Sequence, residues 1–370
     1  MLTAVLIVAA LCLAFANGAN DNFKGVATLY GSGTMSYRRA LTWATVSTLL
    51  GSLTAVFLAE SLLKSFSGKG LVDVELTSSV DYAASVALGA GLTVLLATFV
   101  GMPVSTTHGL VGALIGSGLA AQSAINFGKL GMDFFLPLLT SPFVAVGLTL
   151  LLYPAFRWSR KRLGVSSETC LCVGQKEVEI IPSCCGTVAV ERAAQLTVEF
   201  GNTVTCRSRY AGRMFGLEAG KTLDTLHCLS AGMVSFARGL NDTPKIAALL
   251  LLAPAIGSFG SAALVGLVIA VGGVVCARKV AETMSQKITT MNHGQGFTAN
   301  FVTGLVVIVA SRYALPVSTT HVSCGSLFGL GAATKQGRWE MIRKILGAWI
   351  VTLPIGAALG AGSYLILSRI

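Results

Sequence analysis

Two runs of hydroxyl side chains, each preceded by Pro-Val and followed by a histidine, are the part of this sequence best suited to chemistry. The six residues are Ser105, Thr106, Thr107, Ser318, Thr319 and Thr320. Proline interrupts a helix, so each run is expected to open a new half-helix at the tip of a re-entrant hairpin. Hydroxyls, free backbone N–H groups and the positive end of the helix dipole would meet there, which suits a tetrahedral oxyanion. The alternative is that the hydroxyls only cap a broken helix.

A second motif, also present twice, places charged and amide groups inside apolar stretches. It reads Asn20-Asp21-x-x-Lys24 and Asn241-Asp242-x-x-Lys245. Charged groups are costly in a bilayer and usually serve a function there, so we expect the asparagines and aspartates to line the anion site. The lysines, together with Arg238 and Arg312, would balance a doubly charged anion. The alternative is two simple i,i+3 ion pairs, with the arginines reaching toward the membrane surface.

His108 and His321 directly follow the two hydroxyl runs. A lone histidine in an apolar helix is usually a packing residue. Two histidines at equivalent positions beside an anion could instead donate hydrogen bonds or carry protons, and the sequence leaves both roles open. The sequence contains no zinc-binding triad, no Gly-x-Ser-x-Gly turn and no Walker loop, so we predict neither an enzyme nor a resident metal.

Two different motifs, each present twice and in the same order, indicate that the chain is an internal duplication. The first copy is predicted to occupy residues 1–160 and the second residues 226–370, each with a helix broken at its hydroxyl run. Basic residues are concentrated in particular loops, as they are on the cytoplasmic side of membrane proteins. This bias orients the second copy opposite to the first. It predicts two inverted-topology repeats with re-entrant hairpins, an architecture of secondary transporters.

Composition places these elements in a membrane. The chain has 370 residues, of which 53% are hydrophobic and 12% charged, whereas soluble domains carry roughly 25% charged residues. Several apolar stretches are long enough to cross a bilayer as helices. We therefore predict an all-α polytopic protein of the cell (inner) membrane. The net charge of +11 falls in the loops, which fits the positive-inside bias and argues against binding to nucleic acid.

Residues 161–225 differ from both copies because they are polar and alternate Val, Thr and Glu. We predict a small soluble cytoplasmic insert with short β-strands at about 177–181, 187–190 and 195–200. Its cysteines could bind zinc, although their spacing matches no standard finger, and free thiols are the simpler alternative. These cysteines are Cys170, Cys172, Cys184, Cys185 and Cys206. A channel, or a receptor that signals through this insert, would be a different class of function.

The two motifs, in this number and order, resemble those of the inorganic phosphate transporter (PiT) family of secondary anion carriers. The resemblance covers about residues 1–160 and 225–370. It rests on Gly18-Ala19-Asn20-Asp21, on Gly239-Leu240-Asn241-Asp242 and on the two Pro-Val-Ser-Thr-Thr-His runs. It implies phosphate uptake coupled to sodium or protons, inverted repeats and a homodimer, with phosphate held by the hydroxyl tips. A sulfate permease on the same scaffold is the alternative, since sulfate is also a tetrahedral dianion.

One departure from the family pattern bears on coupling. The family's Asn-Asp-x-x-Asn-Ala has lysine in place of its last asparagine in both copies, as Lys24 and Lys245. A sodium site needs neutral or anionic oxygens at close range and no fixed cation among them. We therefore predict that transport does not need sodium, although the family would suggest it, and that it runs with protons or down the anion gradient. No other cofactor is expected.

Overall fold

Helices dominate the computed structural model of the chain, which describes residues 1–370 apart from 59–69, 181–190, 203–213, 254–256, 314 and 316. Among the described residues, seven helices are long and apolar enough to cross a membrane. The prediction of a polytopic helical membrane protein is therefore confirmed. The inverted orientation of the two copies stays a prediction.

The first copy begins with a helix that is interrupted at the Asn20–Lys24 motif. The chain leaves α-helical geometry after Asp21, passes through a 3-10 turn and then resumes as a short helix. The elements of this copy are α1 (Leu2–Asp21), η1 (Lys24–Val26), α2 (Ala27–Gly31), α3 (Tyr37–Leu58), α5 (Val74–Thr77), α6 (Val80–Val100), α7 (Thr106–Ala120), α8 (Phe127–Lys129), η2 (Leu130–Phe135) and α9 (Leu136–Arg162).

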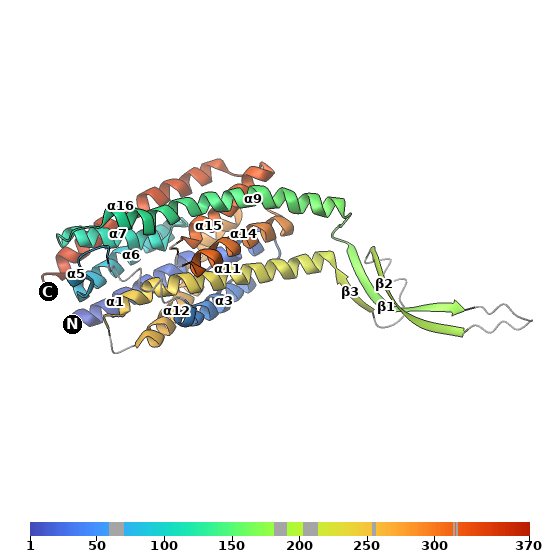
Figure 1. Ribbon diagram of the computed structural model, residues 1–370, viewed down its shortest axis with the longest axis horizontal. Helices are drawn as coiled ribbons and strands as arrows, with labels where there is room; N and C mark the ends of the chain where they lie inside the picture. Colours follow the sequence, from blue (N-terminus) through green and yellow to red (C-terminus); the bar gives the residue numbers. More distant parts are fainter. Residues whose placement is uncertain (59–69, 181–190, 203–213, 254–256, 314, 316) are drawn as a thin grey trace, which may run out of the picture. The chain divides into compact units, whose positions relative to one another are not determined.

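The second copy follows the same order of long helices. Its first helix is not interrupted, although it contains Pro244. The elements are α11 (Ala219–Leu250), α12 (Gly257–Cys276), α13 (Arg278–Glu282), η3 (Thr283–Lys287), α14 (His293–Arg312), α15 (Thr319–Thr334) and α16 (Trp339–Leu367). In Figure 1 these helices run side by side with those of the first copy, and the two chain ends lie at the same end of the bundle.

Both hydroxyl runs open a new helix, as the sequence predicts. Gly101 ends α6 with φ of 76°, a left-handed conformation that glycine adopts without strain. The side chain of Ser105 then accepts the backbone N–H of His108 at 3.2 Å and caps α7. Ser318 accepts the N–H of His321 at 3.2 Å and caps α15 in the same way. The helix breaks are therefore confirmed, and each serine oxygen serves as a cap.

The segment between the copies contains a small antiparallel sheet. Its strands are β1 (Thr169–Ile180), β2 (Glu191–Asn202) and β3 (Met214–Glu218), in the spatial order β2-β1-β3. The strand predicted at 195–200 lies within β2, and residues 177–180 of the one predicted at 177–181 form the end of β1. The strand predicted at 187–190 falls outside the described residues. Pro154–Leu226 forms one compact unit, while Met1–Tyr153 and His227–Ile370 together form the other.

One boundary differs from the prediction. Helix α11 begins at Ala219, inside the segment expected to be insert. The sequence from Lys221 to His227 contains no glycine or proline that would stop a helix. The polar first turns of α11 therefore continue directly into its apolar part.

Glycines let the first helix of each copy pack closely on a helix of the other copy. A Cβ atom at Gly18 of α1 would overlap the carbonyl oxygen of Ile269 in α12. The equivalent Gly239 of α11 meets the carbonyl oxygen of Thr48 in α3 in the same manner. Small residues at such contacts allow backbones in a membrane protein to approach. The two Asn-Asp motifs are thus fixed by crossed contacts between the copies.

The helices that follow the hydroxyl runs pack in a crossed manner as well. Gly116 of α7 lies against Ala357 of α16, with no room for a Cβ atom. Gly329 of α15 lies against Val146 of α9. Each short helix from one copy is therefore held by the long closing helix of the other copy. This arrangement brings the two hydroxyl tips to the middle of one bundle.

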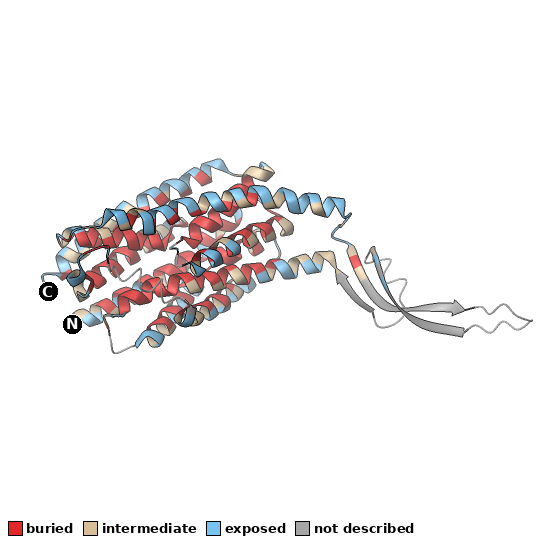
Figure 2. Cartoon of the chain, in the orientation of Figure 1, coloured by how far each residue is buried: buried red, intermediate tan, exposed pale blue. Residues whose placement is uncertain are grey.

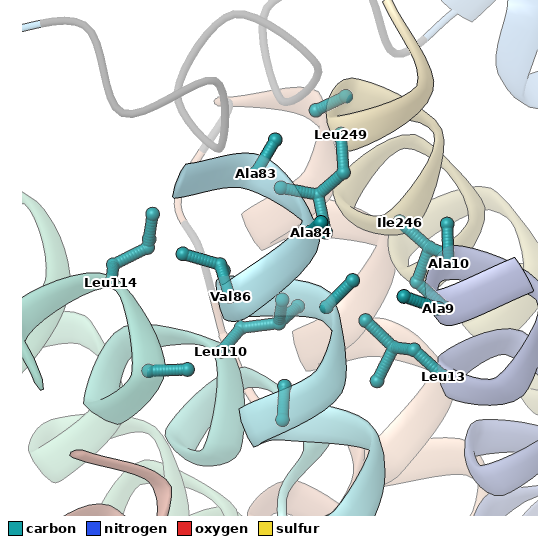
Figure 3. Packing of buried hydrophobic residues seen from close by; sticks show 14 of the residues in the cluster. Ala9, Ala10, Leu13, Ala83, Ala84, Val86, Leu110, Leu114, Ile246 and Leu249 are labelled. Atoms are coloured by element: carbon teal, nitrogen blue, oxygen red, sulfur yellow. The ribbon is translucent and has the colours of Figure 1, made fainter. Parts of the chain in front are cut away.

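An apolar cluster fills the bundle beside these tips. Figure 3 shows side chains of α1, α6, α7 and α11 converging, among them Leu13, Leu110 and Ile246. Figure 2 shows buried residues along the interior helices and exposed residues on α9 and α16. Those exposed positions include Phe143 and Ile350. Apolar side chains on the outside of a bundle are expected where the surroundings are lipid.

Candidate anion-binding site

The two hydroxyl tips touch each other. The hydroxyl of Thr320, from the second copy, donates to the backbone carbonyl of Val104, from the first copy, at 2.9 Å. Helices α7 and α15 both begin at this point, at Thr106 and Thr319. The first backbone N–H groups of a helix have no partner within the helix. Two such helix starts therefore meet in the interior of the bundle.

Lys24 bridges its own motif and the tip of the other copy. Its Nζ atom donates to Asn20 Oδ1 at 2.8 Å, to Val104 O at 2.8 Å and to Thr320 Oγ1 at 2.6 Å. It also forms an ion pair with Asp21 Oδ1. Four oxygens thus surround one ammonium group, more than its three hydrogens require.

Lys245 repeats this arrangement in the second copy. Its Nζ atom lies 3.2 Å from Asp242 Oδ1, 3.2 Å from Val317 O and 2.9 Å from Thr107 Oγ1. Each lysine therefore binds the aspartate three residues before it, the valine carbonyl of its own tip and the last threonine of the opposite tip. The i,i+3 ion pairs that the sequence offers as the alternative do exist, and the same lysines also connect the two copies.

All five charged side chains at this centre are buried. Asp21 is 1% exposed, Lys24 3%, Arg238 1%, Asp242 3% and Lys245 1%. Burying a charge is strongly unfavourable unless it is paired and hydrogen-bonded. Three cations against two anions leave one unbalanced positive charge. An excess of buried positive charge favours the binding of an anion.

Arg238 reaches the centre through Asn17. The guanidinium donates to Asn17 Oδ1 at 3.3 Å, to Asn22 Oδ1 at 3.1 Å and to Thr48 Oγ1 at 2.9 Å. Since arginine can only donate, it must face the oxygen of the Asn17 amide. The amide nitrogen then points the other way, toward the two aspartates.

Asn17 joins the two copies of the motif. Its Nδ2 atom lies 3.1 Å from Asp21 Oδ2, 3.3 Å from Asp242 Oδ2 and 3.0 Å from Thr106 Oγ1. Thr106 also donates to Asp21 Oδ2 at 3.2 Å. Sequence reasoning missed Asn17. The available signal was its position in Phe-Ala-x-Gly, where the second copy carries Arg238.

Asn20 holds the first tip in place. Its Nδ2 atom donates to Thr98 Oγ1 at 2.9 Å and to Met102 O at 3.0 Å, and its Oδ1 atom accepts from Val104 N at 3.1 Å as well as from Lys24. Every polar atom of the Asn20 amide is therefore engaged. Thr98, which the sequence analysis did not single out, completes this anchor from α6.

Asn241 is the equivalent residue of the second copy, but its contacts are fewer. Its Nδ2 atom donates to Val317 O at 3.2 Å and to Asp242 Oδ1 at 3.2 Å. Its Oδ1 atom is buried and has no hydrogen-bond partner among the described residues. The two halves of the centre therefore differ at this amide oxygen.

The two histidine rings meet edge to face beside the tips. The rings of His108 and His321 are 4.5 Å apart between centroids, and His321 stacks on Trp349 at 3.9 Å. The described contacts include no hydrogen bond from either ring to Asp21 or Asp242. Trp349, another residue that sequence reasoning missed, belongs to α16 and had no motif to mark it.

Arg312 is the one predicted charge that does not reach this centre. It is the last residue of α14, and its side chain is exposed. The helix ends there, so the side chain leaves the apolar stretch that precedes it. The expected balance of four cations against two anions is corrected to three against two.

No group of three or more His, Cys, Asp or Glu side chains that could hold a metal ion occurs in the described part of the chain. Cys170 is buried. Cys184, Cys185 and Cys206 lie outside the described residues, so zinc binding by the insert stays untested. Sodium, which needs no such cluster, is a separate question.

The fold and this centre define a class of protein: a multi-pass helical membrane protein whose two related halves meet at a buried, positively charged polar site. Residues 17–360 match the model of the phosphate transporter family. The chain therefore belongs to the phosphate transporter family, which confirms the resemblance seen in the sequence.

Relatives and a solved structure agree with this assignment. The chain is 26% identical to the probable low-affinity inorganic phosphate transporter of Bacillus subtilis, covering 100% of this chain and 98% of that one. It is 27% identical to the chloroplastic inorganic phosphate transporter 2-1 of Arabidopsis thaliana, covering 92% and 68%. The solved structure of "the sodium-dependent phosphate transporter" matches with a TM-score of 0.76, at 22% identity, over 100% of this chain and 99% of that chain. This last likeness supports the fold.

Proposed function

We propose that this protein is a secondary transporter that carries inorganic phosphate across the membrane without sodium. The anion would be held between the two hydroxyl tips, Ser105–Thr107 and Ser318–Thr320. Membership of the phosphate transporter family supports the substrate. The meeting of two helix starts with an excess of buried positive charge supports the position.

The observation that carries sodium independence is the set of oxygens around Lys24 Nζ. An amide oxygen, a carboxylate, a backbone carbonyl and a hydroxyl surround this atom. These are the kinds of ligands that a bound sodium ion would take. The tethered ammonium occupies such a position and cannot leave it. A sodium ion would have no space there, and the ammonium already supplies the positive charge that these oxygens attract.

The same contacts suggest how the tethered cations serve transport. Each lysine neutralises its own aspartate and holds the last threonine of the opposite tip. The hydroxyls of Thr107 and Thr320 both accept from a lysine. The Thr107 hydrogen can then point to another acceptor, whereas the Thr320 hydrogen already points to Val104 O. When the halves separate, these crossed contacts must break. Energy for transport would then come from the anion gradient or from protons.

Uptake of labelled phosphate into proteoliposomes tests the proposal. We expect the rate to stay the same when sodium is replaced by potassium or choline. The double variant Lys24→Asn with Lys245→Asn restores the family pattern and should make uptake respond to sodium. Loss of wild-type uptake on removal of sodium would contradict sodium independence. If the protein took up no phosphate in sodium, potassium and choline alike, the transport function itself would be contradicted.

A further inference from the structure

The protonation state of the anion can be read from the hydrogen-bond acceptors at the centre. Phosphate carries one or two O–H groups near neutral pH, whereas sulfate carries none. Each buried O–H group needs an acceptor, because an unsatisfied polar group is costly in an interior without water. The number of free acceptors therefore bears on which anion the site takes.

Each carboxylate oxygen at the centre already accepts at least one hydrogen bond. Asp21 accepts from Lys24 at Oδ1 and from Asn17 and Thr106 at Oδ2. Asp242 accepts from Lys245 and Asn241 at Oδ1 and from Asn17 at Oδ2. Asp21 Oδ2 and Asp242 Oδ1 thus have two donors each, whereas Asp21 Oδ1 and Asp242 Oδ2 have one donor each.

The backbone carbonyls of the tips are also occupied. Val104 O accepts from Lys24 and Thr320, and Val317 O accepts from Lys245 and Asn241. A carbonyl oxygen offers two lone pairs, and each of these oxygens uses both. Neither carbonyl is free for an anion's O–H group.

Asn241 Oδ1 is different. Among the described side chains that bond to the two aspartates, it is the acceptor atom without a partner, and its residue is 0% exposed. The amide cannot be turned to remove this feature, because both partners of Nδ2, Val317 O and Asp242 Oδ1, can only accept. Asn241 Oδ1 is therefore the acceptor at the centre that has no donor at all among the described residues.

Charge points in the same direction. The five buried charged side chains sum to one positive charge, and each of the two helix starts adds roughly half a charge. The total of about two positive charges matches a dianion. Hydrogen phosphate as the dianion has two negative charges and one O–H group, which corresponds to one free acceptor.

We infer that the site selects the monohydrogen phosphate dianion and that Asn241 is the specificity residue, accepting the anion's single O–H group at Oδ1. This inference rests on the proposed phosphate transport and extends it. The monoanion brings a second O–H group, which would have to share an oxygen that already accepts a hydrogen bond, and it leaves one positive charge of the site unbalanced. Sulfate brings none and leaves the amide oxygen of Asn241 unsatisfied.

The pH dependence of uptake by the full-length wild-type protein in proteoliposomes provides the first test. The apparent KM for total phosphate should fall as the external pH rises through the range in which monoanion becomes dianion. Expressed as dianion concentration, KM should stay constant. A KM that stays constant across pH only when it is expressed as the concentration of the monoanion would overturn the inference.

Competition between anions provides the second test. Arsenate, which carries a proton over the same pH range, should compete with labelled phosphate nearly as well as phosphate does. Sulfate should compete about tenfold less well or weaker, the effect of one hydrogen bond to a charged group. The Asn241→Leu variant removes the acceptor and should narrow the gap between phosphate and sulfate about tenfold.

Asn20→Leu is the matched control, since the Oδ1 atom of Asn20 already has two donors. It should weaken uptake without changing the ratio between the two anions. Equal changes of that ratio in both variants, or sulfate competition as strong as that of arsenate, would overturn the inference. If uptake required sodium but its KM still depended on the dianion concentration, only the proposed sodium independence would be overturned, and the inference about Asn241 would stand.

Discussion

Trp349 Nε1 donates to the backbone carbonyl of Pro103 at 3.0 Å, which connects the closing helix α16 to the tip of the first copy. The same indole ring stacks on His321 of the second copy at 3.9 Å. One side chain from outside both hairpins therefore touches both. Trp349 belongs to neither repeated motif. The centre therefore has a contact from the second copy that the duplicated motifs do not predict.

Replacing Trp349 separates its two contacts. Trp349→Phe keeps an aromatic ring against His321 but removes the hydrogen bond to Pro103, whereas Trp349→Ala removes both. We expect a moderate loss of phosphate uptake in the first variant and a larger loss in the second, with expression retained in the first. Uptake in proteoliposomes measures this. Wild-type rates in both variants would show that the indole does not position the tips.

The threonines that end the hydroxyl runs should contribute to affinity, Thr107 through its own hydrogen and Thr320 through the position of Lys24. Thr107→Val and Thr320→Val keep the shape of the side chain but remove the hydroxyl. A hydrogen bond to a charged group contributes about 1.5–3 kcal/mol, so the apparent Kd for phosphate should rise about tenfold or more. Binding to the purified protein measures the change. Thr140→Val on the exposed face of α9 is the control, and unchanged affinity in both site variants would leave the hydroxyls with a capping role only.

The helix breaks and the pairing of the two hydroxyl tips could be predicted from the sequence. Proline next to three hydroxyl residues predicts a helix break because the backbone hydrogen bond is lost, and duplication of the pattern pointed to a pair of tips. The contact from Lys24 to Thr320 was not readable, since it joins residues 296 positions apart. The spacing of Asp21 and Lys24 allows a local ion pair to be predicted, whereas the partner from the other copy follows only from the fold.

The misses have physical causes too. Asn17 is an ordinary polar residue until the fold places Arg238 on one side of its amide and two carboxylates on the other. Arg312 follows an apolar stretch and so was expected inside, but composition does not reveal that the helix ends at that residue. In each case the deciding information is the direction of a side chain, which a pattern of residue types does not contain.

The close contact of α7 with α16 should make Gly116 intolerant of a side chain. A Cβ atom there would overlap the Ala357 carbonyl. Because this carbonyl belongs to the backbone of a helix, moving it away costs free energy. Gly116→Ala should therefore lower stability by about 1–3 kcal/mol, a usual cost of overpacking, and lower the Tm in detergent. Gly147→Ala in α9 is the control, since nothing lies within 4 Å of its Cβ position. Equal Tm values for the two variants would contradict the crossed packing.

The insert is predicted to be cytoplasmic, and the same bias of basic residues between loops predicts that the segment before α6 lies outside. A cysteine introduced at exposed Glu75 should react with a membrane-impermeant thiol reagent added to intact cells, and one at exposed Arg162 should not. Labelling is compared with the unaltered chain, which has nine cysteines of its own. Labelling at Arg162 but not at Glu75 would reverse the orientation derived from the basic loops.

The ion pair of Asp21 and Lys24 offers a way to separate folding from transport. Asp21→Asn leaves the ammonium of Lys24 buried without its counter-charge, and breaking a buried pair in this way costs about 3–5 kcal/mol. We expect a marked fall in Tm and in phosphate uptake. Adding Lys24→Met removes the unpaired charge, so stability should largely return. Uptake should not return, because the contact to Thr320 and one positive charge of the site are lost with the lysine.

Lys344→Met at the exposed pair with Glu340 is the control and should change neither property measurably. Recovery of both stability and uptake in the double variant would mean that the pair only holds the fold together and takes no part in carrying the anion.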